Sequence, residues 1–320
     1  MNVIPRADPP PITPASVPDR IGLFYATLGA IGFSVKAILV KLAYQHGVGV
    51  DAETLLALRM VFSLPFFIVM AWISNRRAST ALTPRDGIWL FGLGLLGYYL
   101  ASYLDFLGLR YISAALERLI LFVYPTLVVI LGALLFGQPI TRRMLGALAL
   151  CYTGIALAVT HDLRVAGTGQ DIVLGGALIF GSALCYAFYL LGNGRVVNRL
   201  GSVRVTAFAS IVACLLAIGQ FLLARSFTVL DQPWQIYALT LGMALFSTVL
   251  PVWMVSEAIR RLGAGPVALT GSLGPVVTLL LAWWLLNEPI GITQLLGSTL
   301  VIGGVMMMAR RSSPTAGTAR

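Results

Sequence analysis

Ten long apolar runs fill most of the sequence, and each is close to the length that a helix needs to cross a lipid bilayer. A hydrocarbon core of about 30 Å requires about 20 helical residues. Only 11% of the 320 residues are charged, whereas soluble chains average about 25%. We therefore predict an all-α polytopic membrane protein, and we exclude a soluble enzyme, a disordered tail and a nucleic-acid-binding domain. Its ten transmembrane helices are expected at residues 21–45, 53–74, 87–109, 112–136, 141–160, 171–193, 204–224, 234–260, 264–286 and 290–310.

The basic residues predict the orientation of these helices. Residues 1–20 are rich in proline and are expected to form a disordered cytoplasmic leader, and residues 311–320 a cytoplasmic tail. With both termini on one side, fifteen of the 22 Lys and Arg residues fall on that side, four on the other and three within the spans. Cytoplasmic loops carry such an excess. We expect a multi-pass protein of the cytoplasmic (inner) membrane with both termini in the cytoplasm.

An internal repeat organises the chain. A shift of 150 residues without a gap superposes Arg110 on Arg260, Pro125 on Pro275, Pro139 on Pro289 and Gly154 on Gly304. Each half then holds five spans, an odd number, so the second half must lie upside down relative to the first. We predict a five-helix repeat at residues 21–160 and its inverted copy at residues 171–310. Inverted repeats are typical of secondary transporters, whose substrate site lies near the middle of the membrane.

The repeated motifs resemble those of the drug/metabolite transporter superfamily, EamA type. They are FGQPI at 136–140, LNEPI at 286–290, the Gly-rich last helix of each half, and LLALRMVFSLPFF at 55–67. The resemblance covers about residues 20–310 and implies export of small molecules such as amino acids, metabolites or drugs. Gln138 departs from the acidic residue that this family often has in the turn, so Glu288 need not have a counterpart in the first half.

Lys36 is the deepest charge in the chain, about 14 Å from the nearer end of its predicted span at 1.5 Å per residue. An ionised group at this depth needs a partner, a water-filled cavity or a function. Two interpretations stay open. Lys36 either meets a substrate carboxylate or changes protonation during transport, or it forms a structural ion pair between helices.

A polar face follows the third and fourth predicted spans. Tyr98, Ser102 and Asp105 share one helix face, and Glu117 and Tyr124 share another by their spacing of seven residues. These faces predict a cavity open to the outside. In the alternative interpretation, Asp105 pairs with Arg110, and Glu117 pairs with Arg118 or Arg59, in a structural network.

Other candidates come from both halves. Arg59, Arg118 and Asp105 are candidates for ion coupling or for that outer network. Tyr186 is a candidate lining residue of the second half, on one face with Tyr189 and Asn193. Pro125 and Pro275 are predicted helix breaks.

These features predict a secondary transporter that exports small metabolites, amino acids or related zwitterions, by alternating access. Lys36, Glu117, Tyr98, Tyr124 and Tyr186 would bind the substrate. We expect no cofactor, no metal and no catalytic residue, since the sequence has no nucleotide-binding, nucleophile–base or metal-ligand pattern. Protons are the candidate coupling ion, and a homodimer is a candidate assembly. The alternatives are a multidrug or lipid-head-group exporter of the same fold and a non-transporting membrane sensor or assembly protein.

Overall fold

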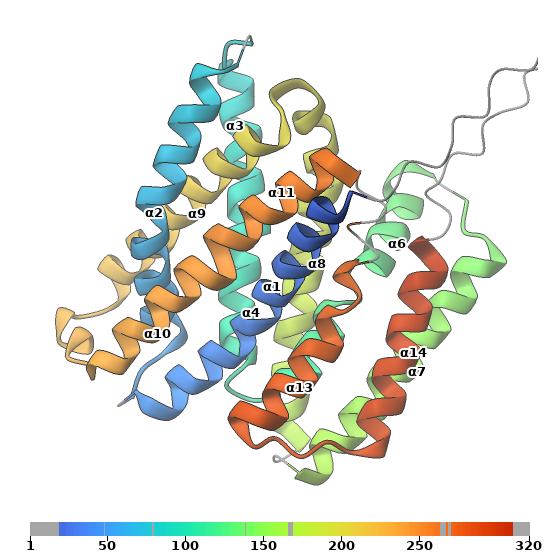
Figure 1. The fold of residues 1–320 in the computed structure, drawn as a ribbon. Coiled ribbons are helices and arrows are strands. Elements are labelled where there is room, and N and C mark those ends of the chain that lie inside the picture. The colour runs from blue at the N-terminus through green and yellow to red at the C-terminus, as the bar shows by residue number, and fades with distance from the viewer. Residues whose placement is uncertain are drawn as a thin grey trace, which may run out of the picture.

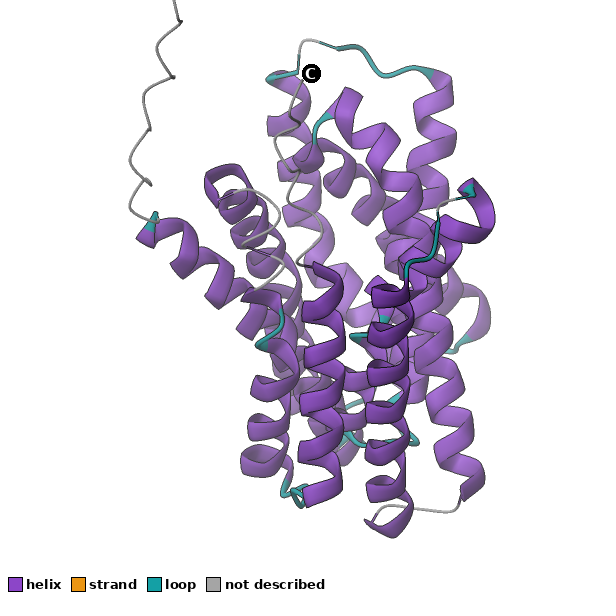
Figure 2. Cartoon of the chain, turned by 90° about the vertical axis from the view of Figure 1, so that its right-hand side faces the viewer, coloured by secondary structure: helices purple, strands orange, loops and turns teal. Residues whose placement is uncertain are grey.

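The computed structural model describes residues 19–47, 49–78, 80–137, 139–165, 169–262, 267 and 270–309. Every regular element within these residues is helical, and long helices run side by side with connections at the two ends of the molecule (Figures 1 and 2). Most of the predicted leader, the predicted tail and Gln138 lie outside the described residues. We name the two ends of the bundle after α1 (Arg20–His46) as the Arg20 end and the His46 end.

Eight helical segments of the described residues are long and apolar enough to cross a membrane, by length and composition. They correspond to the first eight predicted spans. Two shorter apolar helices follow, Gly274–Leu286 and Ile292–Met307. The ten-span count stays a prediction, because residues 264–266 and 268–269 of the ninth predicted span are not described. The elements that follow α1 are α2 (Ala52–Arg76), α3 (Pro84–Leu93), η1 (Gly94–Leu100), α4 (Ala101–Gly108), α5 (Ala114–Leu121), α6 (Tyr124–Phe136), α7 (Arg142–Val165), α8 (Gly169–Leu200), α9 (Ser202–Ala224), η2 (Phe227–Leu230), α10 (Trp234–Ala244), η3 (Leu245–Val249), α11 (Leu250–Leu262), α13 (Gly274–Leu286) and α14 (Ile292–Ala309).

Irregular backbone occurs at matching places of the two halves. The π-helical turn η1 lies within α3–α4, and its counterpart η3 lies within α10–α11, close to the shift of 150 residues. Two-residue breaks at 122–123 and 272–273 precede α6 and α13. Pro125 and Pro275 lie in the first turn of the helix after each break, where the missing N–H leaves no hydrogen bond unmade.

The same shift relates the helix contacts. The helix α1 packs against α11 and α13, and α8 packs against α4 and α6. The two most extensive contacts pair α2 with α9 on one side of the molecule and α7 with α14 on the other (Figure 1). Each of these pairs joins one helix from either half of the sequence.

Glycines allow α7 and α14 to approach closely. A Cβ atom on Gly297 would lie 2.5 Å from the carbonyl oxygen of Gly154, and one on Gly304 would lie 2.6 Å from Cys151 Sγ. Small residues permit such backbone contact between membrane helices, where close packing drives association. The repeated pair Gly154 and Gly304 therefore serves this interface.

Charged side chains join α2 to α9 at both ends. At the His46 end, Arg225 pairs with Asp51 at 3.0 Å and with Glu53 at 2.5 Å. At the Arg20 end, Arg204 donates to the Thr80 carbonyl oxygen at 2.7 Å and to the Asn75 side chain. These contacts hold the two helices in one register along their length.

Candidate functional site

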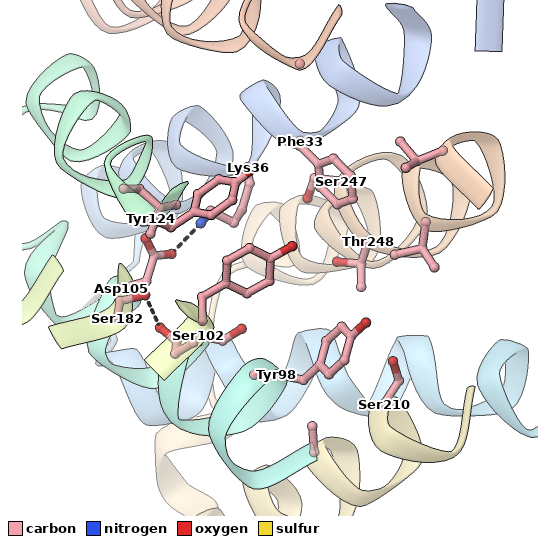
Figure 3. Close-up of a pocket in the computed structure, with 18 of the residues that line it drawn as sticks. Phe33, Lys36, Tyr98, Ser102, Asp105, Tyr124, Ser182, Ser210, Ser247 and Thr248 are labelled. Atoms are coloured by element: carbon pink, nitrogen blue, oxygen red, sulfur yellow. Dashed lines mark hydrogen bonds and ion pairs between the residues drawn. The ribbon is translucent and has the colours of Figure 1, made fainter. Parts of the chain in front are cut away.

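A cavity of about 430 Å³ lies in the middle of the bundle. Helices of both halves line it, whereas α7 and α14 contribute none of its described lining residues. Its wall is mostly apolar. The hydroxyl-bearing residues Tyr98, Tyr124, Ser102, Ser210 and Thr248 lie at different places along this wall (Figure 3). The volume falls in the range of cavities that hold small molecules.

One end of the cavity is an ion-pair network. Lys36 Nζ lies 2.6 Å from Asp105 Oδ2 and 3.3 Å from Glu117 Oε1 (Figure 3 shows Lys36 and Asp105). The side chains of Asp105 and Glu117 are 2% and 0% exposed, and that of Lys36 is 16% exposed. The proposed partners Arg110, Arg59 and Arg118 are therefore wrong for the two carboxylates, because Lys36 from α1 reaches both and pairs with both. Arg110 instead lies over the Tyr44 ring, 5.9 Å from its centroid.

The cavity extends from this network toward the Arg20 end. Its lining residues on α1 are Ala26, Ala30, Phe33 and Lys36, and on α11 they reach Ile259 near the Arg20 end. Lys36, held by two carboxylates, closes the His46 side, where Phe106 is fully buried behind it. The expectation of a cavity open to the outside stays a prediction, because it depends on which side of the membrane the Arg20 end meets.

Two further cations adjoin the network. Arg59 is 4% exposed, so it does not extend to the membrane surface; it donates to Ser102 Oγ at 3.0 Å, and its guanidinium carbon lies 4.9 Å from the Phe106 ring centroid. Arg118 lines the cavity beside Gly274, where a Cβ atom would lie 2.6 Å from Arg118 Nη2. No carboxylate oxygen in the described residues lies within 4.0 Å of Arg118.

The predicted tyrosines meet at the cavity wall. Tyr98, Tyr124 and Tyr186 line the cavity, and Tyr189 lies behind them with its hydroxyl oxygen 3.0 Å from that of Tyr98. The Tyr124 and Tyr186 ring centroids are 5.0 Å apart in an edge-to-face arrangement. The expected common face of Glu117 and Tyr124 is wrong, because the break at 122–123 reorients α6 relative to α5. Tyr124 faces the cavity, while Glu117 is buried and does not line it.

A polar cluster at the start of α5 was not predicted. Asp162 of α7 accepts hydrogen bonds from the Ser113 N–H and Oγ, both at 2.9 Å. Glu288, which precedes α14, accepts one from the Ala114 N–H at 3.2 Å, and burial raises the pKa of its carboxyl group above the ordinary range. The LNEPI motif singled out Glu288, but no spacing in the sequence connects it with a helix 174 residues earlier.

Comparison with known proteins decides the family. The model of the EamA-like transporter family matches residues 20–160 and 173–310. The chain belongs to the EamA-like transporter family. It is thus a multi-pass membrane protein of a transporter family, and its site is a cavity in a transporter fold.

Relatives in this family span nearly the whole chain. The uncharacterized transporter YcbK of Bacillus subtilis (strain 168) is 28% identical, over 90% of this chain and 91% of its own. The uncharacterized transporter sll1319 of Synechocystis is 26% identical, over 93% and 96% of the two chains. One solved crystal structure superposes with a TM-score of 0.61 at 18% identity, covering 93% of this chain and 99% of its own, which shows likeness of fold alone.

Proposed function

We propose that this member of the EamA-like transporter family is a secondary transporter that exports small organic metabolites across the cytoplasmic membrane by alternating access. The observation that carries the proposal is the central cavity of about 430 Å³, which is lined by both halves and ends at the Lys36 network. In the proposed orientation, with both termini cytoplasmic, this cavity extends toward the cytoplasm, as a loading state for export requires.

The proposed architecture is ten spans in two inverted five-helix repeats. Three observations support it. The two halves have matching π-helical turns and matching breaks before α6 and α13, and the helices that α8 contacts correspond in the repeat to those that α1 contacts. Breaks at equivalent places in inverted halves let one half rock against the other around a fixed site. Lys36, Tyr98, Tyr124 and Tyr186 would surround the substrate, with Glu117 acting behind Lys36 and protons as the candidate coupling ion.

A non-transporting sensor is the alternative from another class. A buried, mutually paired Lys36 and Glu117 favours it, and the pairing is present. That alternative also requires a bundle without a continuous cavity, whereas the described residues enclose one of about 430 Å³. We therefore favour transport.

The test is uptake into inside-out membrane vesicles from cells that make the protein, with a panel of labelled metabolites and amino acids. Two variants are compared with the wild type: Lys36→Ala, and Val252→Trp, which fills the cavity from α11. We expect uptake by the wild type and its loss in both variants. Val173→Trp is the matched control, since Val173 is 71% exposed on the outer face of α8. Equal uptake by wild-type and empty membranes across the panel would contradict transport of this class.

A further inference from the structure

The charges around the cavity do not balance. Among the described residues, three cations, Lys36, Arg59 and Arg118, face or adjoin the space, but only two carboxylates, Asp105 and Glu117, do so. Lys36 engages both carboxylates, at 2.6 Å and 3.3 Å. One positive charge is therefore left in excess at the closed end of the cavity.

The excess charge is located at Arg118. Arg59 has neutral partners, since it donates to Ser102 Oγ and lies over the Phe106 ring, while its Nε has no hydrogen-bond partner. Arg118 lines the cavity and, among the described residues, has no carboxylate within 4.0 Å. An uncompensated cation in an apolar space is unfavourable, and an anion that enters the cavity removes this cost. A planar guanidinium also fits a carboxylate through two parallel hydrogen bonds.

The cavity offers no matching place for a substrate ammonium. Asp105 is the one carboxylate among the described lining residues, and its side chain is 2% exposed and bonded to Lys36. An incoming ammonium would have to displace Lys36 from this pair. The carboxylate of a zwitterion thus gains the contact with Arg118, but its ammonium finds no free carboxylate. A monoanion gains the same contact and has no ammonium to place.

The other lining residues indicate which uncharged part of a ligand would fit the cavity. Phe33, Tyr124 and Tyr186 present aromatic rings, and Met60 and Val252 add apolar surface. Rings of this kind favour a flat or branched apolar group with few polar atoms. The body and the charged end together define one chemical class.

We propose that the cavity selects small organic monoanions, a carboxylate on an aromatic or branched apolar body, over zwitterions and amines, with Arg118 as the group that binds the carboxylate. This inference rests on the proposed function only in so far as the cavity is the transport site. It replaces the class expected from the sequence, amino acids or related zwitterions, by molecules that carry the carboxylate without the ammonium.

Four compounds with one skeleton test the selection: 3-phenylpropionate, phenylalanine, 3-phenylpropylamine and 3-phenyl-1-propanol, as monoanion, zwitterion, cation and neutral form. Binding to the purified full-length protein is measured by calorimetry at pH 7.5. We expect 3-phenylpropionate to bind more tightly than each of the others by about ten- to a hundredfold, the range for a hydrogen-bonded charge.

Variants at Arg118 test whether this residue binds the carboxylate. Arg118→Gln should lose this preference while binding of 3-phenyl-1-propanol stays the same, and Arg118→Lys should retain part of it. Arg76→Gln is the control, because Arg76 lies over the Trp72 ring, away from the cavity. Unchanged elution in gel filtration verifies the fold of each variant.

Three results would overturn the inference: phenylalanine binding as tightly as 3-phenylpropionate, no binding of any of the four, or an unchanged preference in Arg118→Gln. The vesicle assay judges transport separately. Selective binding of the monoanion without uptake of any metabolite would contradict the proposed function and leave the assignment of Arg118 in place.

Discussion

One ammonium serves two carboxylates at the closed end of the cavity, where Lys36 Nζ contacts both Asp105 and Glu117. An ionised side chain in the centre of a membrane costs about 2.5–3.5 kcal/mol even on insertion scales. The three groups reduce this cost for one another. Neither carboxylate oxygen of Glu117 has a hydrogen bond, although Oε1 lies 3.3 Å from Lys36 Nζ. At the scale of residues, the loss of Lys36 would therefore leave both carboxylates buried without the cation that pairs with them.

Replacement of the shared cation should destabilise the fold. In Lys36→Met, two buried carboxylates face each other, and we expect a loss of about 3–5 kcal/mol in the free energy of unfolding. The measurement is denaturation in mixed detergent micelles. Adding Asp105→Asn should recover part of the loss, since one carboxylate is then neutral. Arg20→Met, at the exposed start of the same helix, is the control, and equal stabilities of Lys36→Met and Arg20→Met would contradict the role of the network.

Glu288 should tolerate an amide but not a truncation. Glu288→Gln keeps an oxygen for the Ala114 N–H, whereas Glu288→Ala removes a cap of α5 and should cost about 1 kcal/mol. Burial raises the pKa of Glu288 in the folded protein, so the folded state holds this proton more tightly than the unfolded chain. Its contribution to stability therefore falls as the pH rises above about 4.5, the ordinary value. Unfolding of wild type and Glu288→Gln at several pH values should show this decline in the wild type alone.

At the scale of elements, most of the helices were predictable and their irregularities were not. Runs of apolar residues give helix positions because their length is set by the bilayer. The breaks before α6 and α13 followed from the repeated prolines, although the structure places each proline just after its break. The π-helical turns carry no proline, and nothing in the local pattern of η1 predicts them. The shared face of Glu117 and Tyr124 was predicted from their spacing of seven residues, which holds only in an unbroken helix, whereas the break at 122–123 lies between them.

The α7–α14 contact depends on glycine at position 297 and not at position 303 of the same helix. A Cβ atom on Gly297 would lie 2.5 Å from the Gly154 carbonyl oxygen, whereas one on Gly303 would meet nothing within 4 Å. Gly297→Ala should destabilise the protein by about 1–3 kcal/mol through forced separation of the helices. Gly303→Ala should be neutral or slightly stabilising, since alanine favours helix. Detergent unfolding of both variants checks this, and the reverse order of stabilities would contradict the packing.

At the scale of the whole molecule, the direction of the cavity and the orientation of the chain together predict the side of the membrane to which the cavity opens. Val255 of α11 lines the cavity toward the Arg20 end, and Phe227 lies in the connection at the His46 end, 68% exposed. The excess of Lys and Arg predicts that the Arg20 end is cytoplasmic. The cavity should then be reached by water from the cytoplasm in this conformation.

Cysteine labelling tests the orientation. The native cysteines are replaced by alanine, and Val255→Cys or Phe227→Cys is introduced. A maleimide that cannot cross membranes should label Val255→Cys in inside-out vesicles and Phe227→Cys in right-side-out vesicles. Labelling from the opposite sides would invert the proposed orientation, and labelling of Val255→Cys from neither side would contradict an open path to the cavity.

The site was partly predictable because a buried charge is conspicuous in an apolar sequence. Lys36, Asp105 and Arg118 could be singled out by depth alone, since each charged group in a span needs a reason. Their partners could not be, because pairing across helices depends on packing that is distant in sequence: Lys36 and Asp105 are 69 residues apart. The same limit hid the contact of Glu288 with α5.

The distribution of charge over the repeat gives the molecule a polarity that its scaffold lacks. The shift of 150 residues places Tyr186 opposite Lys36, Val255 opposite Asp105 and Gly274 opposite Tyr124. Two inverted halves with the same chemistry would have inward and outward states of equal energy, like a symmetric double well. Here the charged lining groups among the described residues all come from the first half. Under the proposed alternating access, the two wells would then differ in depth, and the protein would rest with its cavity toward one side of the membrane even without a substrate.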